Sequence, residues 1–236
     1  DRTVIPLHFA PKQSWFVVFR RPDAGRGGRF KARNIPTLRE LATLSGPWEV
    51  SFDEKWGGPA RVIFEHLEDW TRRPEEGIRY YSGMATYRNT FDAPRGRRGE
   101  LYLDLGEVKN VARVRLNGKE LGVVWTAPWR VAVGDAVKAT GNQLEIDVVN
   151  LWPNRLIGDG LLPKGQRRTK TNVRLYDTPL PQDVPLYHSD PEASRRRRTG
   201  ASPDLLSSGL LGPVKLIVEV RNAEGDRSKL ARATTL

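Results

Sequence analysis

The stretch 101-LYLDLGEVKNVARVRLNGKELGVVW-125 gives the clearest indication of the fold, because its apolar residues recur at alternate positions. Leu101 and Leu103 lie on one face of an extended chain, and the polar residues between and beside them take the other face. A second alternating run ends at Asn117 and Gly118, a pair that adopts the positive φ angles of a tight type I′ turn. The stretch therefore predicts short antiparallel strands, two of them joined as a hairpin.

The same period of two extends through most of the chain. It recurs in 129-WRVAV-133, 143-QLEIDV-148 and 214-VKLIVEV-220. Short strands that are apolar on one face and separated by Gly, Pro and Asn are typical of two antiparallel sheets packed face to face. We therefore predict an all-β fold, an antiparallel β-sandwich. Its predicted core contains Leu103, Val114, Leu116, Ile146, Val148 and Leu216.

The first forty residues differ from the rest. The run 14-SWFVVFRRP-22 is apolar on both faces, and 35-IPTLRELATLSG-46 has leucines at roughly helical spacing, which predicts a short helix. The chain begins with Asp1 and strand-like sequence, so we expect it to belong to a longer protein. We predict that residues 1–43 end an upstream domain and supply a linker, that 44–221 form the sandwich, and that 222–236 are a tail.

Composition narrows the chemistry. The 236 residues include no cysteine and three separated histidines, which excludes disulfides and thiolate chemistry and argues against a histidine-based metal site. The net charge of +11 favours polyanionic partners, but Arg95–Arg98 and Arg195–Arg198 are flanked by Gly, Pro or Ser. We interpret these clusters as solvated loops. There is no apolar run of membrane-spanning length, so no membrane partner is expected.

The stretch 147-DVVNLWPNRLIGDGLLP-163 begins as a strand and continues as an expected irregular loop. Sugars stack their C–H faces on aromatic rings and pair their hydroxyls with amides, carboxylates and guanidinium groups. Both kinds of side chain occur here and in two other loops, 54-EKWGGP-59 and 79-RYYSG-83. The predicted sugar-binding residues are Trp152, Asn154, Arg155, Asp159, Trp56, Tyr80 and Tyr81.

Structural roles compete with sugar binding at several of these positions. Trp152 could plug the end of the sandwich, the role that we favour for it. Arg155 and Asp159 could form an internal ion pair that fixes the loop, and for Arg155 the two alternatives stay open.

Catalysis by this chain alone is not expected. Glycoside hydrolysis needs two carboxylates on either side of the scissile bond. Glu75, Glu76, Asp159 and Asp183 lie on predicted loops, but none has surroundings that single it out. A Gly-x-Ser-x-Gly nucleophile motif is absent from the sequence. No catalytic residue is predicted.

An ordered set of motifs resembles the C-terminal β-sandwich of bacterial family 106 glycoside hydrolases, α-L-rhamnosidase-like enzymes that act on plant polysaccharides. More distantly, the chain is similar to the sugar-binding jelly roll of family 2 enzymes such as β-galactosidases. The resemblance covers roughly residues 44–220. The motifs are 45-SGPWEVSFD-53, 67-LEDWTRRPEEGIRYYSGMATYRNTFD-92, 101-LYLDLGEVKNVARVRLNGKELGVVWTAPWRV-131, 142-NQLEIDVVNLWPNRLIGD-159 and 207-SSGLLGPVKL-216.

This resemblance implies a galactose-binding-like jelly roll that packs on a catalytic barrel of the same parent chain and breaks no bond itself. It implies a carbohydrate partner, a secreted or periplasmic bacterial location and no required cofactor. Related sandwiches often hold a structural calcium, although the sequence names no ligands for one. The Arg-rich insert 192-EASRRRRTGASPD-204 departs from the family pattern.

Two other functions remain as alternatives. One is a free-standing, lectin-like binder of acidic polysaccharide that uses Arg and Trp side chains. The other is a nucleic-acid-binding β-domain, suggested by the positive charge. The aromatic residues do not alternate with Lys and Arg on a strand face as single-strand binders require, so we expect no nucleic-acid partner.

Overall fold

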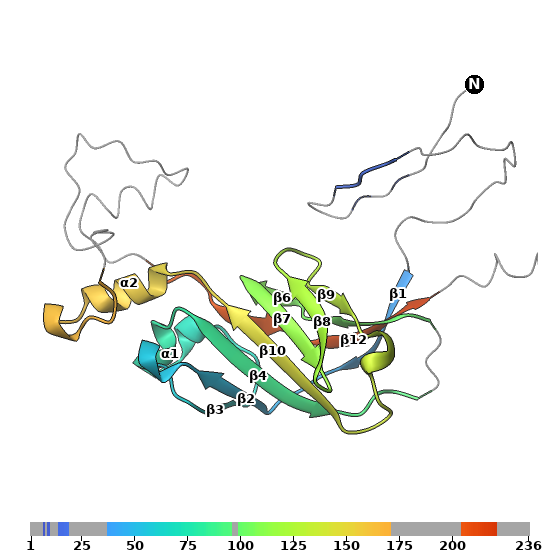
Figure 1. The fold of residues 1–236 in the computed structure, drawn as a ribbon, viewed down its shortest axis with the longest axis horizontal. Helices are drawn as coiled ribbons and strands as arrows, with labels where there is room; N and C mark the ends of the chain where they lie inside the picture. The colour runs from blue at the N-terminus through green and yellow to red at the C-terminus, as the bar shows by residue number, and fades with distance from the viewer. Residues whose placement is uncertain are drawn as a thin grey trace, which may run out of the picture.

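The computed structural model describes residues 7, 9, 14–18, 37–95, 99–170 and 204–220. Within these ranges, antiparallel pairing builds one sheet of four strands and one of six, with a further two-stranded ladder. The four-stranded sheet has the order β1-β12-β5-β9, and the six-stranded sheet has the order β3-β2-β4-β10-β7-β8. This arrangement confirms the predicted all-β, antiparallel β-sandwich (Figure 1).

The six-stranded sheet consists of β2 (Trp48–Phe52), β3 (Val62–Phe64), β4 (Met84–Phe91), β7 (Val111–Leu116), β8 (Lys119–Val124) and β10 (Asn142–Val149). The four-stranded sheet consists of β1 (Thr37–Thr43), β5 (Leu101–Asp104), β9 (Arg130–Ala132) and β12 (Lys215–Val220). The short ladder joins β6 (Glu107–Lys109) to β11 (Gly209–Gly212). The helices are α1 (Glu76–Arg79) and α2 (Pro153–Gly160), with 3-10 turns at Glu54–Trp56, Trp70–Arg72, Gly134–Ala136 and Lys164–Gln166.

One apolar core lies between the sheets. The alternation of β10 places Leu144, Ile146 and Val148 inward, and each is at most 1% exposed. The inward side chains of the facing sheet include Leu103 and Leu216, which are fully buried in the same cluster. All six core residues predicted from the alternation belong to this cluster, so the prediction is confirmed.

Aromatic side chains fill the end of the core nearest α1. Trp70 meets Phe52 and Tyr81 edge to face, with ring centroids 5.2 and 5.7 Å apart. The indole Nε1 of Trp70 donates a hydrogen bond to the hydroxyl of Tyr87 at 2.5 Å, and the Leu210 N–H donates to the same oxygen at 3.2 Å. Burial raises the pKa of Tyr87 above its usual range. This end of the core is therefore closed by stacked rings whose buried polar atoms are satisfied.

The predicted hairpin is confirmed. Asn117 and Gly118 connect β7 to β8 with φ angles of 54° and 80°, the positive values that a type I′ turn requires. The backbone of Asn117 is further fixed by its own side chain, because its Nδ2 donates to the carbonyl of Ala136 at 2.7 Å. The turn is thus held by the segment that runs from Ala136 into β10.

The predicted helix at residues 35–46 is wrong. Residues Thr37–Thr43 form β1, which pairs antiparallel with β12 at the edge of the four-stranded sheet. The edge of β12 offers this segment a ladder of backbone hydrogen bonds, which outweighs the weak helical spacing of its leucines. The sheet thus begins seven residues before the predicted start of the sandwich at residue 44. The predicted tail, 222–236, and most of the predicted upstream segment lie outside the described residues.

The packing of β10 can be tested with one core truncation. Ile146→Ala removes a fully buried side chain from the middle of the core and should lower the free energy of unfolding by about 2–5 kcal/mol. Val123→Ala, at a side chain that is 52% exposed on β8, is the matched control and should change it by less than about 0.5 kcal/mol. Urea denaturation followed by tryptophan fluorescence measures both. Equal effects of the two changes would contradict the proposed core.

Candidate functional site

The stretch after β10 is a helix and not the irregular loop that the sequence predicted. Helix α2 runs from Pro153 to Gly160, with Trp152 at its N-cap. Proline is favoured at the first helical position because its missing N–H would have no helical partner there. Figure 1 shows α2 and α1 at the same end of the sandwich. The polar and aromatic residues of this stretch are therefore placed by a helix.

Ser208, which precedes β11, is the centre of a buried polar cluster beside α2. Its Oγ accepts hydrogen bonds from the side-chain amides of Asn150 at 3.1 Å and Asn154 at 3.0 Å. Its N–H donates to Asp69, and its carbonyl accepts from the Trp70 N–H at 3.0 Å. Ser208 is only 2% exposed. One buried hydroxyl thus links the end of β10, the start of α2 and the turn at Trp70–Arg72.

The start of α2 is bonded to the chain on both sides. The side chain of Asn154 binds the backbone of Leu206 at two points, donating to its carbonyl and accepting from its N–H, both at 2.7 Å. The Arg155 N–H donates to Ser82 Oγ at 3.1 Å, and that hydroxyl donates to the Leu151 carbonyl at 2.8 Å. These bonds satisfy backbone groups on either side of Trp152 and at the start of α2, and they restrict the segment that carries this residue.

Arg155 and Asp159 form a buried ion pair one helical turn apart. The Arg155 Nε and the Asp159 Oδ1 are 3.0 Å apart, and both side chains are about 5% exposed or less. The pair lacks the alignment of a hydrogen bond, so the contact is mainly electrostatic. Burial lowers the pKa of Arg155, although the carboxylate of Asp159 opposes this. The interpretation of Arg155–Asp159 as an internal pair thus agrees with the structure.

Asp159 also holds the chain that leaves α2. Its Oδ2 accepts hydrogen bonds from the N–H of Thr169 at 2.6 Å and from the hydroxyl of Thr169 at 2.5 Å. Burial opposes the ionisation of Asp159, but the donors of Thr169 and the charge of Arg155 outweigh it and hold the pKa of this carboxyl below its usual value. The ionised carboxylate therefore anchors the segment around residue 169 against the helix.

Trp152 and Trp56 form an aromatic wall on the outer side of α2. Their rings meet edge to face with centroids 5.3 Å apart, and Trp152 is 53% exposed. The role of Trp152 as a plug, which we favoured from the sequence, is therefore wrong, because the residue is half exposed. The two indoles border a hollow of about 510 Å³. Its lining residues are Trp56, Trp152, Leu156, Arg168, Thr169 and Lys170.

The predicted sugar-binding residues divide into two groups. Trp56 and Trp152 line the hollow, and the half-buried Tyr80 packs beside Gly158 of α2. Asn154, Arg155, Asp159 and Tyr81 are buried, and their polar groups are engaged inside the protein. These four support the shape of this end of the sandwich and do not offer free groups to a ligand.

Sequence reasoning missed the other lining residues. Leu156, Arg168, Thr169 and Lys170 border the hollow but were not predicted. The basic residues of 166-QRRTK-170 were a sequence signal for a positively charged surface. No sequence pattern connects them to Trp56, which lies more than a hundred residues earlier. Arg168 reaches that loop because its guanidinium lies against Gly57, whose φ of 87° and missing side chain leave room for it.

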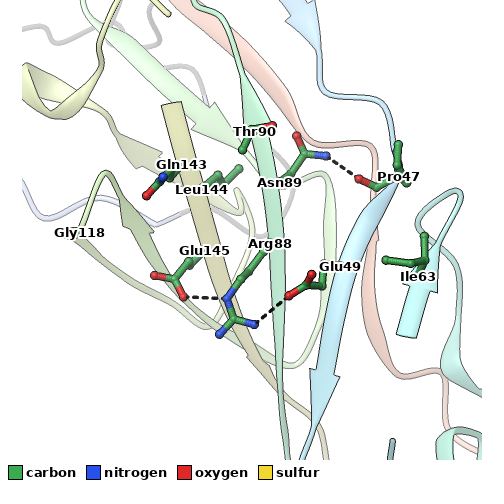
Figure 2. A pocket seen from close by; sticks show the side chains of 10 residues that line it. All are labelled: Pro47, Glu49, Ile63, Arg88, Asn89, Thr90, Gly118, Gln143, Leu144 and Glu145. Carbon is green, nitrogen blue, oxygen red and sulfur yellow. Dashed lines mark hydrogen bonds and ion pairs between the residues drawn. The ribbon is translucent and has the colours of Figure 1, made fainter. Parts of the chain in front are cut away.

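A second hollow, of about 610 Å³, lies on the outer face of the six-stranded sheet. Figure 2 shows Arg88 at its centre between Glu145 and Glu49, with nitrogen–oxygen distances of 3.2 and 3.8 Å. The charges are thus paired with one another, and the residues that line this hollow include no aromatic ring. It is larger than the hollow at α2 but lacks the surface on which a sugar would stack.

Two further features of the described ranges concern metals and membranes. No group of three or more His, Cys, Asp or Glu side chains is placed there to hold a metal ion, so the structure names no ligands for the predicted calcium. In the same ranges, no helix has the length and apolar character to cross a bilayer.

Part of the sandwich matches a known protein-family model. Residues 69–157 match the family model described as "Glycosyl hydrolase 2 galactose-binding domain-like". The matched residues run from the turn at Trp70 through β10 into α2, so they include Trp152. The fold is accordingly an all-β, galactose-binding-like sandwich.

Two longer proteins are similar to this chain. It is 37% identical over 209 residues to a "Putative beta-glucuronidase" of Formosa agariphila, a match to 83% of this chain and 17% of that protein. It is 38% identical to the solved rhamnosidase of Novosphingobium sp. PP1Y, with a TM-score of 0.62 over 78% of this chain and 15% of that one. The chain therefore spans about a sixth of the length of each.

The structural role of Arg155 can be tested by removing its side chain. Arg155→Ala leaves the carboxylate of Asp159 buried without its cation, which should lower the free energy of unfolding by about 3–5 kcal/mol. Arg61→Ala is the matched control, because Arg61 is 72% exposed in its ion pair with Glu49, and it should change stability little. Urea denaturation at neutral pH measures both. Unchanged stability of Arg155→Ala would contradict a structural pair.

Proposed function

We propose that the chain is a non-catalytic, carbohydrate-binding module of a bacterial glycoside hydrolase of the α-L-rhamnosidase-like kind, family 106, that acts on plant polysaccharide. One observation carries the binding role: two tryptophans in edge-to-face contact at 5.3 Å, one of them half exposed, wall a hollow at the end of the sandwich. An exposed aromatic wall beside polar groups suits the apolar face and the hydroxyls of a sugar ring.

The comparisons support a place inside a larger enzyme. The two similar proteins described above are printed as a rhamnosidase and a putative β-glucuronidase, and this chain corresponds to about a sixth of each. In our proposal the catalytic carboxylates belong to a barrel domain of the same parent chain. The residues that line the hollow at α2 include no carboxylate, so that hollow lacks the pair that glycoside hydrolysis needs.

An apolar row on the six-stranded sheet suits contact with that barrel. Val149 pairs with Met84 on one side and Val111 on the other, and all three lie on the outer face of the sheet. Met84 and Val149 are 49% and 39% exposed, and Leu151, which follows them towards α2, is 51% exposed. Contact with a neighbouring domain would cover this row and leave the hollow at the edge of the contact. A secreted or periplasmic location is part of the same proposal.

Sugar binding at the hollow predicts a specific loss. Trp152→Ala removes the exposed half of the aromatic wall and should weaken oligosaccharide binding at least about tenfold, since aromatic anchors contribute most of the affinity at such sites. Stability should stay nearly unchanged. Trp125→Ala is the matched control, because Trp125 is 73% exposed and does not line the hollow.

The measurement is a glycan array that carries neutral, uronate-containing and sulfated plant-type and algal-type oligosaccharides, followed by isothermal titration of each ligand that binds. Loss of affinity with Trp152→Ala and retention with Trp125→Ala supports the proposed site. If both variants lose affinity equally, or if neither variant changes the affinity, the hollow is not the sugar-binding site. A chain that binds no glycan in either assay would leave it only a scaffolding role.

A further inference from the structure

The rim of the hollow at α2 is positively charged. Arg168 and Lys170, two of its six lining residues, are both exposed, and the other four are uncharged. Within the described ranges, neither cation has a carboxylate at ion-pair distance. In contrast, the cations on the outer face of the six-stranded sheet are paired with Glu49, Glu145 or Asp147. The hollow therefore keeps two cations that no carboxylate of the described residues neutralises.

Nearby carboxylates do not cancel this charge. The carboxylate of Asp159 pairs with Arg155 and accepts both hydrogen bonds of Thr169. Its negative charge is therefore balanced beneath the residues that line the hollow. Asp53 and Glu54 precede Trp56 but do not line the hollow, and the carboxylate of Asp53 accepts a hydrogen bond from the Lys55 N–H at 2.9 Å. A ligand in the hollow thus meets a net positive charge from Arg168 and Lys170.

Arg168 is held in place for such a ligand. Its Nη1 donates to the Lys55 carbonyl at 3.2 Å, and its guanidinium lies against the backbone of Gly57. A Cβ at residue 57 would come within 3 Å of the guanidinium in its present position, and the glycine leaves that space clear. A guanidinium offers five N–H donors, so one bond to Lys55 leaves donors free for an anion.

We propose that this hollow binds an anionic sugar residue, stacked on Trp152 and Trp56 and paired through its charged group with Arg168 and Lys170. The charged group is a uronate carboxylate or a sulfate ester, which share the planar or clustered oxygens that a guanidinium recognises. The inference rests on the proposed carbohydrate-binding role of the same hollow and adds the charge of the ligand. Trp contacts supply the sugar selectivity, and the two cations supply the selectivity for an anion.

Isothermal titration of the 236-residue chain with matched oligosaccharides tests the inference. The probes are galacturonate and glucuronate trisaccharides, the methyl esters of the same trisaccharides, and sulfated galactan oligosaccharides. The esters keep the rings and remove only the charge. The acid or the sulfate form should bind at least about tenfold more tightly than the neutral esters at low salt, since charge-assisted bonds to a held guanidinium are strong. The difference should shrink as salt rises. Whichever of the two anionic forms binds more tightly identifies the source of the charge.

Three substitutions make the test specific. Arg168→Gln and Lys170→Gln should each weaken binding of the anionic form by about tenfold and leave ester binding unchanged. Lys164→Gln removes the same charge from an exposed lysine outside the hollow and should leave both unchanged.

The outcomes separate this inference from the proposed function. Esters that bind as tightly as acids, with binding lost in Trp152→Ala, would overturn the anionic preference and leave the carbohydrate-binding role intact. The absence of binding to any oligosaccharide would overturn both. Equally tight binding of single-stranded DNA that persists in Trp152→Ala would contradict the inference and favour a non-specific polyanion surface.

Discussion

The hydroxyl of Ser208 imposes the constraint on which this end of the protein depends. It accepts from Asn150 and Asn154 and donates to the carbonyl of Leu206, at distances of 2.9–3.1 Å, in an interior from which water is excluded. Each unpaired polar group in such a place would cost about 1–3 kcal/mol, so the four residues have few alternative arrangements. Because Asn150 directly follows β10 and Asn154 lies in the first turn of α2, the direction of the helix is fixed by the sheet. Trp152 lies between these two residues and is held in a half-exposed position. Within the described ranges, no residue covers its outer face.

Charge is distributed differently on the two sides of this sandwich. On the outer face of the six-stranded sheet, Asp147 is 3% exposed and is bonded to Arg113, Arg115 and Thr86. Burial opposes the ionisation of this carboxyl, but the three donors outweigh burial and hold its pKa below the usual value. Such mutual pairing leaves little attraction for an outside ion. At α2, the buried side chains of Arg155 and Asp159 pair with each other. The cations at the rim of the hollow, Arg168 and Lys170, have no carboxylate partner within the described ranges. The α2 end and the outer face of the six-stranded sheet thus differ in how their charged side chains are paired.

Alternation was enough to predict the sandwich and its core. Residues such as Ile146 and Leu103 lie in strands in which alternate side chains point into the core, so the period of two alone identifies them as buried. The β1 strand could not be predicted, because "TLRELAT" has no strong period and becomes a strand only through pairing with β12, more than 170 residues away. The same limit applies to the site. Asn154, Arg155 and Asp159 were recognised as important, but whether they face a ligand or the interior depends on Ser208 and Thr169, which no local pattern connects to them. Trp152 was misjudged for the same reason, since its exposure is decided by the direction of α2.

The segment after β10 is a rigid support for the aromatic wall. Amide hydrogen exchange measured by NMR tests this most directly at three N–H groups bonded to side chains: Gly83 to Asn150, Arg155 to Ser82, and Leu206 to Asn154. These amides should exchange slowly, with protection comparable to that of the central strand β10, and Ser208→Ala should increase their exchange rates more than those of β10. Exchange of the three amides at rates close to those of an unfolded chain, while β10 remains protected, would contradict it.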